Sequence, residues 1–151
     1  MQKPQQLRAA LSRSVPLLQQ NPERLIMAIA AGTVVATSAP SLSFEYRYRL
    51  ELTLVDLQQD IEAVIVPLLA WLRDNQPEMM GNAEKRRSDF TFAVDAAGAL
   101  RIGLQLTERV LVTQQDSALQ VTFPGEPTPP ANDDAPLQLW VHGALVSEWQ
   151  R

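Results

Sequence analysis

The sequence predicts a single α+β domain, built from a mainly antiparallel or mixed sheet that is packed by two helices. Three observations predict it: one long segment alternates between apolar and polar residues, another has helical spacing, and several short alternating segments are separated by turns. The chain has 151 residues, the length of one ordinary domain, and its 46% hydrophobic content is enough for a packed core.

The clearest strand spans residues 42–54, LSFEYRYRLELTL. The leucines share one set of alternate positions with Phe44, Tyr46 and Tyr48, and the arginines and glutamates occupy the other set. Only a period of two residues explains this pattern, so we expect one buried face and one polar face. At about 3.3 Å per residue the strand is roughly 40 Å long, so we expect it to bend or to project past the core.

Two segments have the spacing of amphipathic helices. In residues 4–14 the apolar side chains recur every three or four positions, and a proline stands in the first turn. Residues 60–74 repeat the pattern, with Asp60 as the expected N-cap and Pro67 predicted to kink the helix or to divide it into two pieces. The polar residues 78–89 are expected to form a connection.

The remaining apolar segments alternate over short lengths. Residues 24–38 predict a hairpin whose turn lies near Ala31 and Gly32. Glu108 falls on the apolar positions of its segment, which predicts a bulge or a sheet edge there. Three further strands are predicted at 90–94, 100–112 and 119–123.

Proline content divides the chain. Residues 124–136 hold five of the 11 prolines and predict a semi-extended spacer that cannot join a sheet. We therefore expect a domain of residues 1–124, a proline-rich spacer of residues 125–136 and a C-terminal strand segment of residues 137–151. That segment needs a sheet edge to pair with, which its own domain or a neighbouring subunit would supply.

The residue types that catalysis and metal binding require are scarce. Cysteine is absent, His142 is the single histidine, and no glycine-rich phosphate-binding motif occurs. We interpret His142 as a structural or exposed residue of the C-terminal strand, and we expect no enzyme activity, cofactor or metal. The net charge of −4 disfavours nucleic-acid binding, and no apolar run is long enough to span a bilayer. We expect a soluble protein that remains in the cytoplasm where it is made.

Side chains suited to protein contacts occur in three places. The run EKRR at residues 84–87 is either a docking patch for a partner or an exposed loop balanced by its own acids. Two arginines of the long strand face away from its aromatic residues and are free to pair with acids of a neighbour. A tryptophan of the C-terminal strand has the parity opposite to that of its apolar neighbours, so we expect it to be exposed. The interface candidates are Arg47, Arg49, Lys85, Arg86, Arg87 and Trp140.

Several runs, taken together, resemble one family. The runs LSFEYRYRLELTL, VPLLAWLRDNQPE, FTF and LTERVLV resemble, in order and spacing, the tail completion protein R family of temperate contractile-tailed coliphages. The resemblance extends from residue 4 to about residue 125, and WLRDNQP and LTERV are its most distinctive parts. Nothing beyond Pro124 matches the family pattern.

The resemblance implies a non-enzymatic assembly protein that completes or caps the head-proximal end of a phage tail and supports head–tail joining. The implied partners are tail tube or sheath proteins, head–tail connector proteins and further copies of the chain. By analogy of fold with tail terminators, it implies a tail-terminator-like α+β fold and a ring of copies. Such a protein would assemble in the host cytoplasm and remain in the virion tail. The alternative function is that of a DNA-binding or adaptor protein near the portal, acting through residues 85–87.

Overall fold

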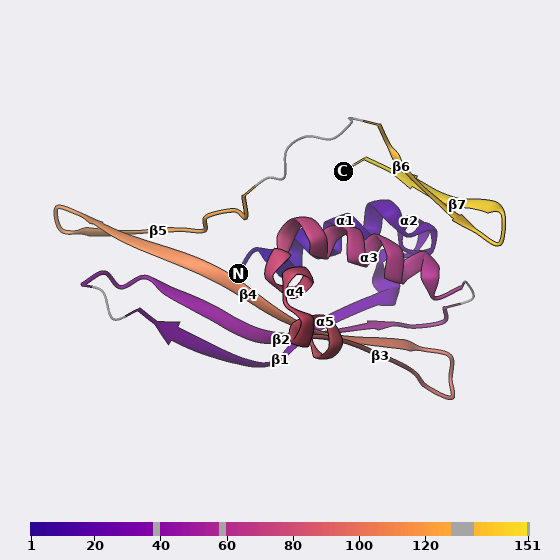
Figure 1. Cartoon of the computed structure of the whole chain (residues 1–151), viewed down its shortest axis with the longest axis horizontal. Coiled ribbons are helices and arrows are strands. Elements are labelled where there is room, and N and C mark those ends of the chain that lie inside the picture. The colour runs from indigo at the N-terminus through magenta and orange to yellow at the C-terminus, as the bar shows by residue number, and fades with distance from the viewer. Residues whose placement is uncertain (38–39, 58–59, 128–134, 151) are drawn as a thin grey trace.

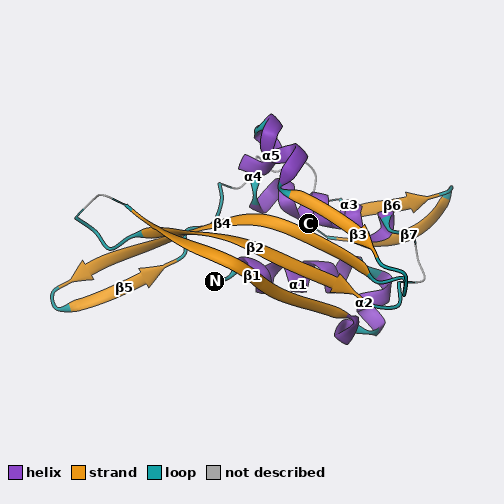
Figure 2. Cartoon of the chain, turned by 90° about the horizontal axis from the view of Figure 1, so that it is seen from below, coloured by secondary structure: helices purple, strands orange, loops and turns teal. Residues whose placement is uncertain are grey.

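The computed structural model describes residues 1–37, 40–57, 60–127 and 135–150, and it confirms the α+β class. Among these residues a five-stranded, wholly antiparallel sheet has the order β1-β2-β4-β3, with β5 paired to the far end of β4 (Figures 1 and 2). The strands are β1 (Leu25–Ala36), β2 (Phe44–Leu54), β3 (Phe90–Val94), β4 (Leu100–Gln115) and β5 (Ala118–Thr122).

Helices cover part of one sheet face and one sheet edge (Figure 1). They are α1 (Lys3–Ser14), α2 (Pro16–Gln20), the 3-10 turn η1 (Pro22–Arg24), α3 (Glu62–Asn75), α4 (Pro77–Gly81) and α5 (Ala83–Ser88). Both predicted helices are confirmed as α1 and α3, and α3 continues through Pro67 as one element.

Two predictions about the helical segments were wrong. The N-cap of α3 is Ile61, and no side-chain hydrogen bond caps the helix, so Asp60 does not have the predicted role. Residues 78–89 are not a simple connection, because most of them belong to α4 and α5. Pro77 stands in the first turn of α4, and the Asn82 side chain caps α5 by accepting from the backbone N–H groups of Glu84 and Lys85.

The hydrophobic core lies between α1, α3 and the central strands β2 and β4. The apolar parity of residues 42–54 is confirmed, since the leucines of β2 and Tyr48 are buried, while Arg47 and Glu51 are exposed on the other face. Deeply buried side chains from these four elements include Leu7, Leu11, Leu50, Leu52, Leu68, Leu72, Ile102 and Leu104.

The prediction of a hairpin at residues 24–38 was wrong. Residues 25–36 form one continuous strand that pairs with β2 along its whole length, with a register shift between Ile29 and Ala31. Gly32 lies in this strand, close to the Cβ atom of Tyr48, and does not turn the chain. The bulge changes the parity of the strand part-way, and this produced the false signal of a turn.

The outer ends of the long strands project past the helices, as predicted for the long strand β2. We call this projection the wing; it consists of residues 32–36 of β1, 44–46 of β2, 110–115 of β4 and the whole of β5. In Figure 1 it extends to the left, away from the helices.

Glu108 connects the sheet to the first helix. Its side chain is buried on the core face of β4, and the β2–β4 register passes through Glu108 without a shift, so no bulge lies there. The predicted sheet edge is confirmed, because β3 pairs with β4 only up to Leu104 and β5 only from Leu111 onward. The carboxylate accepts hydrogen bonds from the backbone N–H groups of Gln2 and Lys3 and, at 2.9 Å, from the Tyr48 hydroxyl. The first turn of α1 contains no acidic residue, so Glu108 supplies from β4 the negative charge that a helix N-terminus favours.

The Tyr48 hydroxyl is held in its neutral form by this arrangement. Burial, together with the neighbouring carboxylate of Glu108 to which it donates, raises the pKa of Tyr48 far above its ordinary value. At neutral pH the phenol is therefore protonated and donates its hydrogen bond to Glu108.

Gln76 covers the edge of β4 at Thr107, just beyond the residues of β4 that pair with β3. Its side-chain oxygen accepts from Lys3 Nζ at 3.0 Å and from the Thr107 backbone N–H at 3.3 Å, and its side-chain amide donates to Thr107 Oγ1 at 2.8 Å. Lys3 Nζ also pairs with Glu126 Oε1 at 3.0 Å, which joins the segment after β5 to the same cluster. The start of α1, the end of α3 and the middle of β4 are thus connected by buried polar contacts.

We expect Glu108→Gln to destabilise the fold by about 1–3 kcal/mol, because an amide cannot accept all the hydrogen bonds that the carboxylate accepts. Thermal and denaturant unfolding measure the effect. Glu45→Gln is the matched control, since Glu45 pairs with the exposed Arg47. Loss of this ion pair should change the free energy of unfolding by about 0.5 kcal/mol or less. Equal losses in the two variants would contradict the capping role.

We expect the stabilising effect of Asp95 to depend on pH. Asp95 begins the β3–β4 turn, and the N–H groups of Ala99 and Ala97 donate to its Oδ1, both at 3.0 Å. The Ala99 bond first, then that of Ala97 and the nearby Arg101, lowers the pKa of Asp95 below its ordinary value. A lowered folded-state pKa stabilises the protein above the unfolded-state pKa, and this contribution is lost as the pH falls through the folded-state pKa. Melting curves of wild type and Asp95→Asn should therefore differ most at neutral pH and converge in acid; a constant difference would contradict this.

Candidate protein-interaction surfaces

The C-terminal segment is a hairpin, not the single strand that the sequence analysis predicted. It consists of β6 (Leu137–Val141) and β7 (Ala144–Trp149), joined by a turn at His142 and Gly143. Both turn residues have positive φ, which a two-residue hairpin turn requires. His142 is therefore a turn residue rather than a strand residue. Most of the proline-rich spacer predicted at 125–136 lies outside the described residues.

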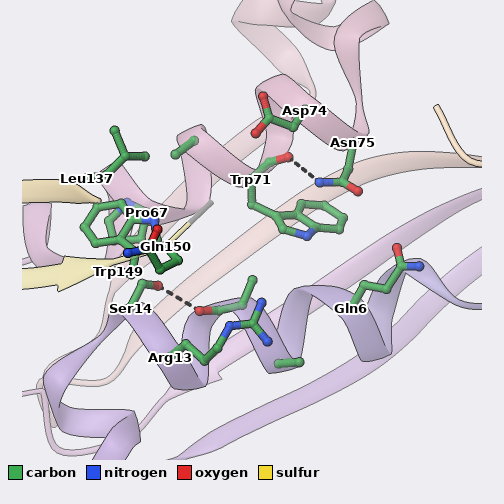
Figure 3. Close-up of a pocket in the computed structure, with 13 residues that line it drawn as sticks. Gln6, Arg13, Ser14, Pro67, Trp71, Asp74, Asn75, Leu137, Trp149 and Gln150 are labelled. Carbon is green, nitrogen blue, oxygen red and sulfur yellow. Dashed lines mark hydrogen bonds between the residues drawn. The ribbon is translucent and has the colours of Figure 1, made fainter. Parts of the chain in front are cut away.

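The hairpin contacts α1 and α3, and together they line a cavity of about 380 Å³ that is partly open to solvent (Figure 3). Trp71 of α3 and Trp149 of β7 line this cavity, and Arg13 and Asp74 contribute its charged groups. Leu139 is buried, as is Ser147, whose hydroxyl has no hydrogen-bond partner within the described part of the chain. The cavity thus combines apolar and polar side chains from α1, α3, β6 and β7 without a cluster of reactive groups.

Trp140 lies near the tip of the hairpin, close to its turn. It is 59% exposed, as its parity predicted, and it pairs across the hairpin with Leu145, another exposed apolar residue. An exposed tryptophan beside an exposed leucine is suited to anchoring a protein contact. Sequence reasoning found Trp140 but missed Leu145, because the hairpin itself was not predicted.

Arg47 and Arg49 lie on the polar face of β2, as predicted, but in different environments. Arg47 is largely exposed and pairs with Glu45 at 2.7 Å. Arg49 reaches across Gly103, where a Cβ atom would collide with its guanidinium, and contacts Thr91 at 3.4 Å. Arg47 is thus available to a partner, whereas Arg49 also connects three strands of the sheet.

The basic run lies on α5 rather than on a loop. Lys85 pairs with Glu78 of α4 at 3.3 Å, while Arg86 and Arg87 are exposed. Lys85 and Arg47 both line a shallow groove of about 230 Å³ that also contains the side chains of Glu45, Glu78 and Asp89. Acidic residues thus accompany the basic ones, which weakens the field that DNA binding would need.

The wing carries several exposed apolar side chains. Val34 of β1 is 59% exposed, and Leu119 and Val121 of β5 are each 56% exposed. The strand registers place all three on the face that, nearer the helices, forms the core. Sequence reasoning missed this surface because it assigned β1 to a hairpin; the absence of charge from Leu25 to Thr37 was the available signal.

The described residues include no group of three or more His, Cys, Asp or Glu side chains that could hold a metal ion. His142 is mostly exposed and has one acidic neighbour, Asp60, at 3.7 Å. Within the same residues, no helix is both long and apolar enough to cross a membrane.

Exposed apolar strands, an exposed tryptophan and scattered charges are typical of the class of proteins that act by binding other proteins. The chain belongs to the P2 phage tail completion protein R (GpR) family, whose model matches residues 1–127. It is 42% identical, over 153 aligned positions, to the tail completion protein R of Escherichia phage P2, and the alignment covers 99% of each chain. No solved structure matches the chain significantly.

These comparisons confirm the family resemblance that the sequence motifs indicated. They also correct its extent, because the relative aligns beyond Pro124 and over the C-terminal hairpin. The family model itself ends at residue 127, before the hairpin.

We expect the hairpin to protect Trp71 within its own chain. In a Trp140→Phe/Trp149→Phe variant Trp71 is the single tryptophan, so acrylamide quenching of its fluorescence reports its exposure. Ending that variant after Pro127, which retains the Lys3–Glu126 pair, should increase the quenching. Quenching of the full-length variant should not change on dilution; an increase on dilution would instead indicate a hairpin supplied by a neighbouring copy.

Proposed function

We propose that this chain is a tail completion protein that finishes the head-proximal end of a phage tail and supports head–tail joining. Membership of the tail completion protein R family, with a relative that aligns over 99% of the chain, is the observation that carries the proposal. The protein acts without catalysing a reaction, through complementary surfaces. It assembles in the host cytoplasm and stays in the virion tail.

The proposed partners are tail tube or sheath proteins on one side, head–tail connector proteins on the other, and further copies of the chain. The exposed apolar residues of the wing and of the hairpin tip support this proposal, because they lie on different elements and each suits burial against a protein. A ring, as proposed here, requires two different surfaces that meet head-to-tail between neighbouring copies.

The proposed contact residues are Arg47, Arg49, Lys85, Arg86, Arg87 and Trp140. Trp140 is the strongest candidate for an anchor, since truncating a central interface tryptophan typically costs about 2 kcal/mol or more of binding free energy. Arg47, Arg86 and Arg87 are suited to steering and orienting an acidic partner, which affects association rate more than affinity.

Interrupting the gene for this chain should yield phage tails that are overlong or unjoined to heads. Electron microscopy of lysates measures tail length and the fraction of joined particles, and wild-type protein supplied from a plasmid should restore both. Normal, joined tails in the absence of the protein would refute the proposed function.

Complementation with Trp140→Ala then tests the proposed anchor. It should restore few joined particles while leaving the melting temperature nearly unchanged, because Trp140 is exposed. Leu69→Ala, which truncates an exposed apolar residue of α3, is the matched control and should complement fully.

A further inference from the structure

The outer edge of β1 is open. One side of the strand pairs with β2 from Leu25 to Ala36, with a register shift at Ala30. Within the described residues no further hydrogen bond reaches the backbone of residues 26–36 from the other side. Alternate residues of an edge strand direct N–H and C=O groups outward, so β1 presents a row of donors and acceptors to another strand.

This edge lacks the usual protection against strand pairing. Residues 25–37 contain no charged residue and no proline, the two devices that most often block an edge. The opposite side of the sheet ends in a shorter edge strand, β3, of five residues. There the outer edge of β4 is covered in turn by β3, by the Asp89 carbonyl and the Gln76 side chain, and by β5.

A second open edge lies on β5, five uncharged residues at the tip of the wing. Each step from β1 through β2 and β4 to β5 is antiparallel, so β1 and β5 run in opposite directions. A second copy that keeps the same strand directions and is shifted along the strands therefore brings its β5 antiparallel to β1.

The side chains of the two edges are compatible. Val34 of β1 and Val121 of β5 lie on the same face of the sheet, both exposed and both β-branched. Pairing the two strands would place apolar residues beside apolar residues, the kind of cross-strand contact that stabilises a sheet. No like charges would meet, since neither strand carries a charge.

We propose that β1 of one copy pairs with β5 of the next, so that the sheets of neighbouring copies form one continuous sheet. The proposal rests on the proposed function, whose homo-oligomer it supplies with a contact. The pairing is head-to-tail, and it leaves no open edge on the wing once the assembly closes. A two-fold pairing of β1 with β1 would leave β5 unpaired.

Neighbouring copies would be staggered along the strands. β1 ends level with Val110 of β4, whereas β5 pairs with residues 111–115, so β5 lies farther out along the wing. A stagger of this kind is what a sheet of tilted strands requires in order to close into a barrel.

Crosslinking tests the pairing directly, because the chain has no cysteine. Val34→Cys and Val121→Cys are made separately and together, and a short bismaleimide, whose reach tolerates a small difference in register, is added to purified protein and to assembled tails. The double variant should give a covalent ladder longer than a dimer, and neither single variant should crosslink. Dimers from Val34→Cys alone, or no crosslink of the double variant in either sample, would overturn the proposal.

A charge exchange provides an independent test. Val34→Lys and Val121→Glu should each weaken self-association about fivefold, and the two changes combined in one chain should restore it, because the new charges meet between neighbouring copies. Sedimentation or light scattering measures self-association, and circular dichroism shows whether each variant is folded. Val66→Lys, on the exposed face of α3, is the matched control. Failure of the double variant to recover would count against the pairing.

The two proposals fail separately. Tails completed by a protein whose variants neither crosslink nor respond to the charge exchange would refute the strand pairing and leave tail completion standing. Normal tails formed without the protein would refute the proposed function, whatever the crosslinking shows.

Discussion

The buried carboxylate of Glu108 fixes the N-terminus of α1 against strands β2 and β4. Burying a charge is costly unless hydrogen bonds compensate for it, and Glu108 accepts from the N-terminus of α1 and from Tyr48 of β2. The helix has no acidic residue of its own in the first turn, so its start is fixed in space by the strand that supplies the charge. Lys3 and Gln76 extend this cluster to the end of α3 and to the segment after β5.

This cluster also separates the molecule into two regions with different roles. On one side of it, α1 and α3 cover the sheet and form a closed hydrophobic core. On the other side the same strands continue as the wing, without helices, and their core-facing positions become exposed apolar residues such as Val34 and Val121. One continuous alternation pattern therefore serves two purposes: burial within the chain, and, as we propose, burial between chains.

The surface charges fit a protein that binds proteins. Most arginines of the polar sheet face and of the helices have acidic neighbours, as in the pairs Arg47–Glu45, Arg49–Glu51 and Arg101–Asp95. Exposed pairs of this type contribute little to stability, but they orient a partner and exclude wrong ones. The open edges of β1 and β5 carry no such charges.

The sequence alone determined much of the fold. Local periodicity predicts the α+β class, both main helices, the burial of one face of β2 and the projection of the long strand. It does so because side-chain burial repeats with the geometry of each element. The exposure of Trp140 followed from the same argument. Tertiary structure alone decided the rest. Whether residues 25–36 turn or continue depends on the partner strand that β2 offers, and whether Glu108 marks a bulge or a cap depends on a helix that begins 105 residues earlier in the chain. A single sequence carries no periodic signal for such long-range contacts, so the open β1 edge became visible only once the sheet was assembled.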